Sequence, residues 1–265
     1  MVKNYLTAAI RFIHRNRTTS FISIVGLGVG IAACFWIIQY IRYEYSYDAH
    51  HQQTDRIYRL STRLQTANSD EKIATTIIGT ASLLNSATKE VKEIVRFNPV
   101  SATVQPNLSE AFQETRFYQA DASAFDIFTY PLRYGKATEA LTQPYSVVLT
   151  ESTAIRYFGK DNLEAALGES LMINQEYYQI TGILEDLPAN SNLLFDGLLS
   201  WDLTTSREDV FFDMSAFTYV LLRKEASLAS FKERLAEIDQ YQFSPAIRRH
   251  WDTEETYASH LIIPL

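Results

Sequence analysis

One long apolar stretch interrupts an otherwise mixed pattern of hydrophobic and polar residues. Residues 21–43 contain no Asp, Glu or Lys, and their only Arg is Arg42. As a helix, the part from Phe21 to Ile41 would extend about 30 Å, the thickness of a bilayer's hydrocarbon core. A helix satisfies its own backbone hydrogen bonds, so it can cross lipid as a single segment. The pattern therefore predicts a transmembrane helix and stalk over residues 19–44.

Two other interpretations of this stretch are less consistent with the pattern. Buried helices of soluble proteins rarely run this long without a charge. The apolar part of a cleaved signal peptide is about 7–15 residues long and leads into small residues at the cleavage site. Here bulky residues follow a longer apolar run. The sequence favours an uncleaved anchor with an interfacial aromatic belt, in which the stalk tyrosines are Tyr40, Tyr43, Tyr45 and Tyr47.

Charge predicts the orientation of the anchor. Glu44 is the first acidic residue, so all 31 Asp and Glu lie from there onward, together with the 19 of 24 Lys and Arg that follow Arg42. The formal charge of that part is thus −12, which argues against nucleic acid or anionic lipid as its ligand. Basic residues are retained in the cytoplasm, which predicts a cytoplasmic N-terminus and an outer main domain. The residues that hold this topology are Lys3, Arg11, Arg15 and Arg17.

Two features flank or lie within the anchor. Residues 1–18 have the spacing of a basic amphipathic helix, which would lie in the cytoplasmic membrane interface or dock a cytoplasmic partner. Gly26 and Gly30 form a G-x-x-x-G pattern, which lets another helix approach closely. The same letters resemble part of a dinucleotide-binding loop, but no strand precedes them. We interpret the two glycines as a helix-packing site.

Beyond the stalk, the pattern changes to short strands and helices. Their order is strand-helix-strand, then a β-rich middle, then strand-helix-strand again. This order predicts an α+β fold, in which a split βαβ layer at 45–98 and 193–265 carries an inserted β-rich subdomain at 99–192. Pro99 is expected to end one of the strands. Strands are predicted at 56–60, 91–97, 113–120, 170–174, 177–184, 216–223 and 260–263, and helices at 80–89, 150–157 and 227–240.

The predicted outer domain carries no recognisable catalytic or metal-binding pattern. The only cysteine, Cys34, lies in the anchor, so a disulfide or a thiol nucleophile in the outer domain is excluded. Asp48, His50 and His51 suggest a metal site, but adjacent histidines point in different directions, so a polar boundary between stalk and domain is favoured. The pair at 185–186 is interpreted as a solvated turn. We expect no catalytic, metal-binding or cofactor-binding residue.

Four segments, in the same order along the chain, resemble MacB/FtsX-type ABC transporter permeases of the kind found in Bacteroidetes. Each segment is weak alone, but together they extend over most of the chain. The segments are Lys3–Leu60; Ala120–Phe128 (ADASAFDIF); Ser146–Ala154 (SVVLTESTA), followed by Tyr157-Phe158-Gly159; and Thr181–Ser191 (TGILEDLPANS).

The resemblance implies a fold and a set of partners. It implies a ferredoxin-like porter layer with an inserted Sabre-like subdomain, in the periplasm and anchored in the bacterial inner membrane. It also implies a homodimer or paired permease that binds a separate cytoplasmic ATPase, because this chain has no ATP-binding motif. ATP hydrolysis would then move the periplasmic domain, a process called mechanotransmission, to export a peptide, an antibiotic-like molecule or a lipoprotein. A periplasmic or outer-membrane partner is also implied.

The sequence leaves alternatives open. Family permeases have further membrane spans, whereas this chain has one, so we expect it to be the N-terminal part of a longer permease. A single-pass sensor or an anchored periplasmic binding protein would also have one span and one acidic outer domain. Only about 20 residues precede the span, which leaves little room for a cytoplasmic output domain. An anchored hydrolase is a more distant alternative, because no nucleophile and base are marked.

Overall fold

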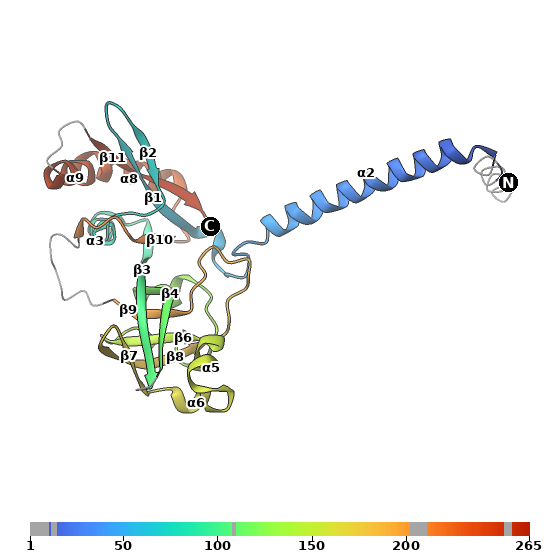
Figure 1. Cartoon of the computed structure of the whole chain (residues 1–265). Helices are drawn as coiled ribbons and strands as arrows, with labels where there is room; N and C mark the ends of the chain where they lie inside the picture. Colours follow the sequence, from blue (N-terminus) through green and yellow to red (C-terminus); the bar gives the residue numbers. More distant parts are fainter. Residues whose placement is uncertain (1–10, 12–14, 108–109, 202–210, 252–255) are drawn as a thin grey trace. The chain divides into compact units, whose positions relative to one another are not determined.

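The computed structural model describes residues 11, 15–107, 110–201, 211–251 and 256–265 (Figure 1). The chain divides into two compact units, Met1–Tyr47 and Asp48–Leu265. We call the second unit the core domain. Most of the predicted amphipathic helix over residues 1–18 lies outside the described residues, so it stays a prediction.

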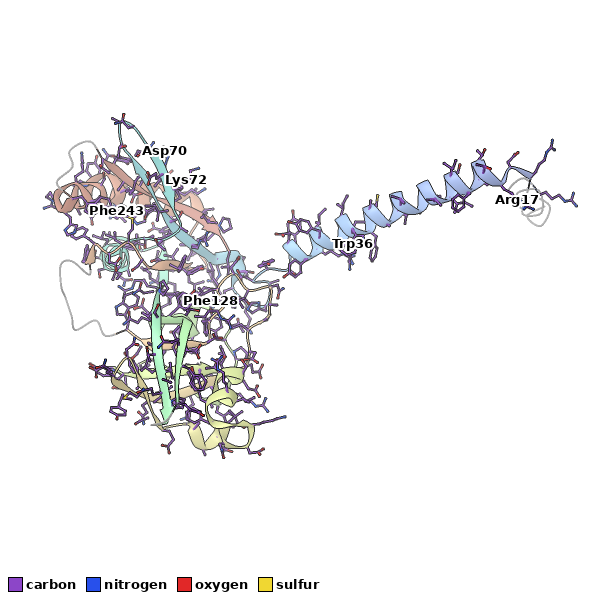
Figure 2. The ribbon with its side chains drawn as sticks, viewed as in Figure 1. Arg17, Trp36, Asp70, Lys72, Phe128 and Phe243 are labelled. Carbon is purple, nitrogen blue, oxygen red and sulfur yellow. The ribbon has the colours of Figure 1, made fainter. Side chains whose placement is uncertain are left out.

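The first unit contains one long helix, α2 (Arg17–Glu44). It is 28 residues long, its mean hydropathy reaches 2.4, and none of its residues is buried. By length and composition, α2 is able to cross a membrane. The helix begins before the apolar run, so Thr18, Thr19 and Ser20 lie within its first turn. The apolar side chains of α2 are exposed, as the example of Trp36 shows, which is 76% exposed (Figure 2).

The first layer of the core domain is a ferredoxin-like sheet. Its strands run in the order β11-β1-β10-β3, and every neighbouring pair is antiparallel. This order confirms the predicted split βαβ arrangement. The elements of the layer are β1 (Ile57–Gln65), α3 (Thr80–Ala87), β3 (Val91–Asn107), β10 (Phe217–Leu222), α8 (Leu228–Ile238) and β11 (Tyr257–Pro264), and β2 (Asp70–Ile73) forms a hairpin with β1.

Helices α3 and α8 cover one face of this sheet. Strand residues alternate between the two faces, so the apolar residues of one face can pack against the helices. Leu84 of α3 and Phe231 of α8 are completely buried against the strands, together with Leu60 and Val220. The N-terminus of α8 is capped by Ser227, whose hydroxyl accepts the Ser230 N–H. Burial of this apolar face supplies the main stabilisation of the layer.

The second layer is the inserted β-rich part. Strand β4 pairs with β3 and runs parallel to β9, and the order continues β9-β6-β8-β5, while β7 pairs with β3 and β8. The predicted hairpin at 170–184 is present, with positive φ at both turn residues, Asn174 and Gln175. The elements are β4 (Glu110–Ala120), α4 (Ala124–Ile127), β5 (Leu132–Gly135), β6 (Ser146–Thr150), α5 (Glu151–Phe158), α6 (Leu163–Ala166), β7 (Ser170–Ile173), β8 (Glu176–Leu184) and β9 (Gly197–Ser200).

Strand β3 runs through both layers, which corrects one sequence expectation (Figure 1). Pro99 does not end the strand, because its residues pair with β4 on both sides of the proline. Pairing of β3 with β10 stops at Phe97, and pairing with β7 begins only at Val104. Between these points one side of β3 has no partner strand among the described residues, so a missing N–H is tolerated there. The predicted boundaries at 98/99 and 192/193 stay predictions.

The remaining short elements lie between the helices and strands already named or directly before them. They are the 3₁₀ turns η1 (Thr54–Arg56) and η2 (Lys160–Asn162), the π-helical turn η3 (Asp239–Phe243), and the helix α9 (Ser244–Trp251). Neither η3 nor α9 was predicted from the sequence. Together they place Phe243 in a small core with Ile77, Ile247 and Ala258.

Candidate functional site

The core domain begins with a clamp that we call the root, formed by Asp48 and His51. Asp48 is 3% exposed and has a positive φ of 54°. Its carboxylate accepts the backbone N–H of Asn192 at 2.9 Å and the side-chain amide of the same residue at 2.6 Å. Its own N–H donates to the Asn190 carbonyl at 3.0 Å. The chain is thus held by both its backbone and its side chain at the first residue of the core domain.

His51 fixes the root from another side. Its Nδ1 accepts the Thr129 N–H at 3.1 Å, which assigns the lone pair to that nitrogen. Its ring lies 4.9 Å from the ring of Phe128 and 5.6 Å from that of Tyr130, both edge-on. Tyr219 of β10 contacts Phe128 in the same way. The root is therefore packed into an aromatic cluster between the two layers.

This geometry does not favour a metal site at the root. The carboxylate of Asp48 and Nδ1 of His51 already have hydrogen-bond partners. In the part of the chain that the structure describes, no three His, Cys, Asp or Glu residues are grouped as metal ligands. Asp48 and His51 are buried anchors of the core domain, where the sequence favoured a polar boundary.

Burial, together with the neighbouring His50, lowers the pKa of His51 from 6.5 to about 4. In the unfolded chain His51 binds a proton below pH 6.5, whereas in the folded domain it does so only near pH 4. Its contribution to stability is therefore present above pH 6.5 and is lost as the pH falls toward 4, by at most about 1.4 kcal/mol per pH unit. Urea unfolding of the full chain at a series of pH values measures this slope.

His51→Phe provides the matched variant for that pH series, because it keeps an aromatic ring and removes the titrating group. We expect a shallower loss of stability between pH 6.5 and 4 in the variant than in the natural chain. Equal slopes in the two proteins would show that His51 titrates normally in the folded state.

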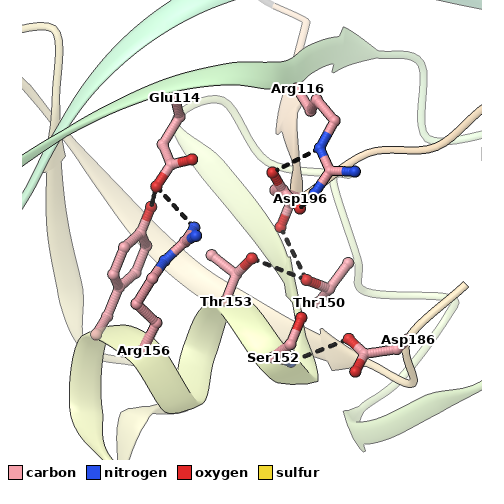
Figure 3. A network of polar contacts seen from close by, with 9 residues as sticks. Glu114, Arg116, Thr150, Ser152, Thr153, Arg156, Asp186 and Asp196 are labelled. Atoms are coloured by element: carbon pink, nitrogen blue, oxygen red, sulfur yellow. Dashed lines mark hydrogen bonds and ion pairs between the residues drawn. The ribbon is translucent and has the colours of Figure 1, made fainter.

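The root is connected to the inserted layer by a segment that we call the linking loop, residues 185–196. Beyond the two asparagines that hold Asp48, this loop ends at Asp196. The Asp196 carboxylate forms a two-bond ion pair with Arg116 of β4, at 2.7 and 3.0 Å (Figure 3). Its carbonyl accepts the Thr150 N–H at 3.0 Å, just before α5.

The start of the same loop contacts helix α5. Asp186 accepts the Ser152 N–H at 3.0 Å, in the first turn of the helix (Figure 3). A carboxylate there satisfies a free N–H and complements the helix dipole. The 185–186 pair is exposed, as a solvated turn would be, but Asp186 also caps α5. The linking loop therefore contacts the root and the N-terminal end of α5.

A second polar group joins α5 to β4. Glu114 is 7% exposed, and one of its oxygens accepts from the Arg156 guanidinium and the Tyr157 hydroxyl, both at 2.7 Å (Figure 3). Burial and the bond to Glu114 raise the pKa of Tyr157, so its hydroxyl stays protonated. Helix α5 is thus held at one end by the linking loop and along its length by β4.

One further constellation resembles a catalytic triad. Asp239 accepts from Nδ1 of His260 at 2.5 Å, and the other ring nitrogen of that histidine lies 3.2 Å from the Thr80 hydroxyl. Thr80 is fully buried, so no substrate reaches its oxygen. Sequence reasoning missed this group because the three residues come from distant elements, and we interpret it as a structural bond.

The residues that the sequence proposed as functional lie in the first unit. Lys3 is outside the described residues, whereas Arg11, Arg15 and Arg17 are exposed. A Cβ atom built on Gly26 or Gly30 meets nothing within 4 Å, so the helix surface there is open. Of the stalk residues, Tyr43 and Tyr47 stack edge-on at 5.4 Å. Tyr40 is 64% exposed and Tyr45 is 84% exposed. The roles of all these residues stay predictions.

Comparison with protein families decides the identity of the fold. The model of the MacB-like periplasmic core domain matches residues 20–238. The chain belongs to this family. The match includes most of α2 as well as the root, the inserted layer and α8. The predicted permease resemblance is thereby confirmed, and the chain is a transporter component and not an enzyme.

Solved structures support the same fold. A domain described as a permease protein from Porphyromonas gingivalis is 20% identical, with a TM-score of 0.67, and the match covers 81% of this chain and 92% of that domain. The extracellular domain of the noncanonic ABC-type transporter YknZ from Gram-positive bacteria is 15% identical, with a TM-score of 0.50, covering 76% of this chain and 99% of that domain. No protein of curated function matches the chain.

Proposed function

We propose that this MacB-like core domain transmits movement from the membrane to the periplasm in an ABC transporter. The observation that carries the proposal is the root clamp. Only three residues separate Glu44, the last residue of α2, from Asp48. A displacement of α2 therefore reaches the core domain through a short, hydrogen-bonded connection and not through a long flexible linker.

The linking loop extends this connection to the inserted layer. It contacts the root through Asn192 and the start of α5 through Asp186. Asp196 at its other end is tied to β4. A contiguous set of hydrogen bonds is a physical route by which a shift at the root would reorient α5, provided that these contacts are coupled energetically.

The proposed partners follow from two observations: the sequence has no ATP-binding motif, and the chain belongs to the MacB-like family. The sequence contains no phosphate-binding loop, so a separate cytoplasmic ATPase supplies the energy. The N-terminus is cytoplasmic, the core domain is periplasmic, and two permease chains associate. Exported peptides, antibiotic-like molecules or lipoproteins are the proposed cargo. The basic residues Arg11, Arg15 and Arg17 would border the ATPase, and Gly26 and Gly30 would pack against another span.

Replacing Asp48 with Ala tests the role of the root. The change leaves the Asn192 amides unpaired, so we expect a loss of about 1–3 kcal/mol in stability and a loss of ATP-dependent movement of the core domain. Movement is measured as the change in distance, on adding ATP, between spin labels at Lys160→Cys in the two permease chains, in a Cys34→Ala background. Asp55→Ala, an exposed carboxylate nearby, is the control.

A separate purification tests the partners that the family implies. The gene product, purified in detergent from its native membrane, is expected to carry an ATPase subunit with it. Recovery of a single-span protein without an ATPase would contradict the proposal and favour the sensor or binding-protein alternative. An ATP-dependent distance change that persists in Asp48→Ala would retain the transporter but reject the root as its transmission point.

A further inference from the structure

Four cations gather at one end of the ferredoxin-like sheet. The strand register places the start of β1 beside the end of β10, since Ile57 pairs with Leu221. Leu222 in turn pairs with Val91 at the start of β3. The segments just outside these strand ends therefore meet at one end of the sheet. In the sequence, the root lies shortly before the first of these segments. Distance along the sequence concealed this grouping.

These segments line an open cavity of about 360 Å³, which we call the basic pocket. Its lining has four positive groups and one carboxylate, although the chain from Glu44 onward has a formal charge of −12. Overall charge argued against anionic ligands, but the fold creates a local exception. The lining residues are Gln53, Arg56, Lys92, Arg223, Lys224 and Glu225.

Both guanidinium groups are held in place by neutral acceptors. Arg56 donates to the Leu222 carbonyl at 3.1 Å and to the Gln53 side chain at 2.8 Å. Arg223 donates through Nε to the Lys89 carbonyl at 3.0 Å. Each guanidinium carries five N–H groups, so donors remain for a ligand. The arginines are oriented before any ligand arrives, which lowers the entropy lost on binding.

The pocket differs from six other arginine sites in the core domain. Ion pairs within 4.0 Å hold Arg63, Arg96, Arg116, Arg133, Arg156 and Arg234 to carboxylates. Among the described residues, none of the four pocket cations has such a pair. Glu225 lines the pocket and offsets part of the charge, which leaves a local excess of three positive charges. Unneutralised cations at a concave surface attract an external anion.

We propose that the basic pocket binds a phosphate group. Arginine presents paired donors that match phosphate oxygens, and lysine adds charge without directional demands. The phosphate would belong either to a lipid headgroup or to a soluble phosphate ester. Gln53 lies nine positions after Glu44, and an extended chain of that length spans at most about 30 Å. A lipid headgroup is one possible source because the segment that precedes the pocket in the chain is the predicted membrane anchor.

Neutralising the two lysines tests the pocket without disturbing its hydrogen bonds. Lys92 and Lys224 are exposed, so Lys92→Gln/Lys224→Gln is expected to fold normally. The control, Lys72→Gln/Lys232→Gln, removes the same charge from exposed positions on β2 and α8. Calorimetric titration of the full chain in non-ionic detergent with glycerol 3-phosphate is expected to show binding. The pocket variant should weaken it about three- to tenfold, and the control should leave it unchanged.

A second measurement decides whether the phosphate belongs to a lipid headgroup or to a soluble phosphate ester. Hydrogen exchange at residues 223–225 is compared in nanodiscs of phosphatidylcholine with and without phosphatidylglycerol. Slower exchange with phosphatidylglycerol, lost in the pocket variant only, assigns the site to a lipid headgroup. Binding of glycerol 3-phosphate without any lipid effect assigns it to a soluble ester. Absence of both effects, or equal losses in pocket variant and control, overturns the proposal. Neither measurement depends on an ATPase, so the transporter proposal is tested separately.

Discussion

Replacing Asp121 with Ala is expected to destabilise the core domain by about 3–5 kcal/mol, because it leaves a buried guanidinium without its counter-ion. The side chain of Arg96 is only 6% exposed. It donates to both carboxylate oxygens of Asp121, at 2.9 and 2.7 Å, and its backbone N–H donates to the same group. No other acidic group forms an ion pair with Arg96 among the described residues.

Chemical unfolding of the full chain in non-ionic detergent, followed by near-UV circular dichroism, measures this loss. Asp126→Ala is the matched control, because that carboxylate is exposed and lies five residues further along the same segment. We expect the control to cost less than about 0.5 kcal/mol. A comparably small effect of Asp121→Ala would show that water or another acceptor compensates Arg96.

A double variant separates the contribution of the ion pair to stability from the contribution of side-chain packing at the same place. Arg96→Met with Asp121→Ala removes both charges and keeps an unbranched side chain beneath Trp201, whose ring lies 4.6 Å from the guanidinium carbon. Replacing both members of a buried pair with apolar groups is often neutral. We therefore expect the double variant to recover most of the stability lost by the single one, and a further loss would indicate that packing dominates.

The position of Asp121 shows what the sequence was able to predict. Residues 120–128 were recognised as a family segment, and the structure forms the short helix α4 within it. The partner of Asp121 was not predicted, because Arg96 lies on another strand and an ion pair leaves no periodic signal. Repeating patterns identify elements, whereas the polar contacts between elements depend on how those elements meet.

The fold itself was largely accessible from the sequence. The two strand-helix-strand units have clear periodicities, so a split βαβ layer was predicted with helices that correspond to α3 and α8. Strands β2, β5, β6 and β9 were missed because they are short, and every residue of β6 and β9 is buried, so their residues do not alternate. The sequence marked Asp48, His50 and His51 as a polar cluster, but it did not show that Asp48 and His51 are buried in the core domain.

The last prediction concerns the bond between Asp239, the first residue of η3, and His260 of β11, which we expect to contribute about 2–4 kcal/mol. One oxygen of Asp239 accepts the His260 backbone N–H at 2.7 Å, and the other accepts Nδ1–H of the same residue. Both side chains are buried, and the imidazole lies against Phe243 with ring centres 4.2 Å apart. Asp239→Ala leaves two donors without partners in a site that water does not reach, and this accounts for the expected cost.

Glu237→Ala, two residues earlier and exposed, is the control for this change and should cost at most about 1 kcal/mol. Asp239→Asn keeps an acceptor for one of the two donors, so its loss should lie between those of Asp239→Ala and Glu237→Ala. Urea unfolding of the full chain in detergent gives the three values under the same conditions. If Asp239→Ala unfolds at the same urea concentration as the control, the pairing of β11 with β1 and the apolar contacts of the layer hold β11 in place, and the Asp239–His260 bond is dispensable for folding.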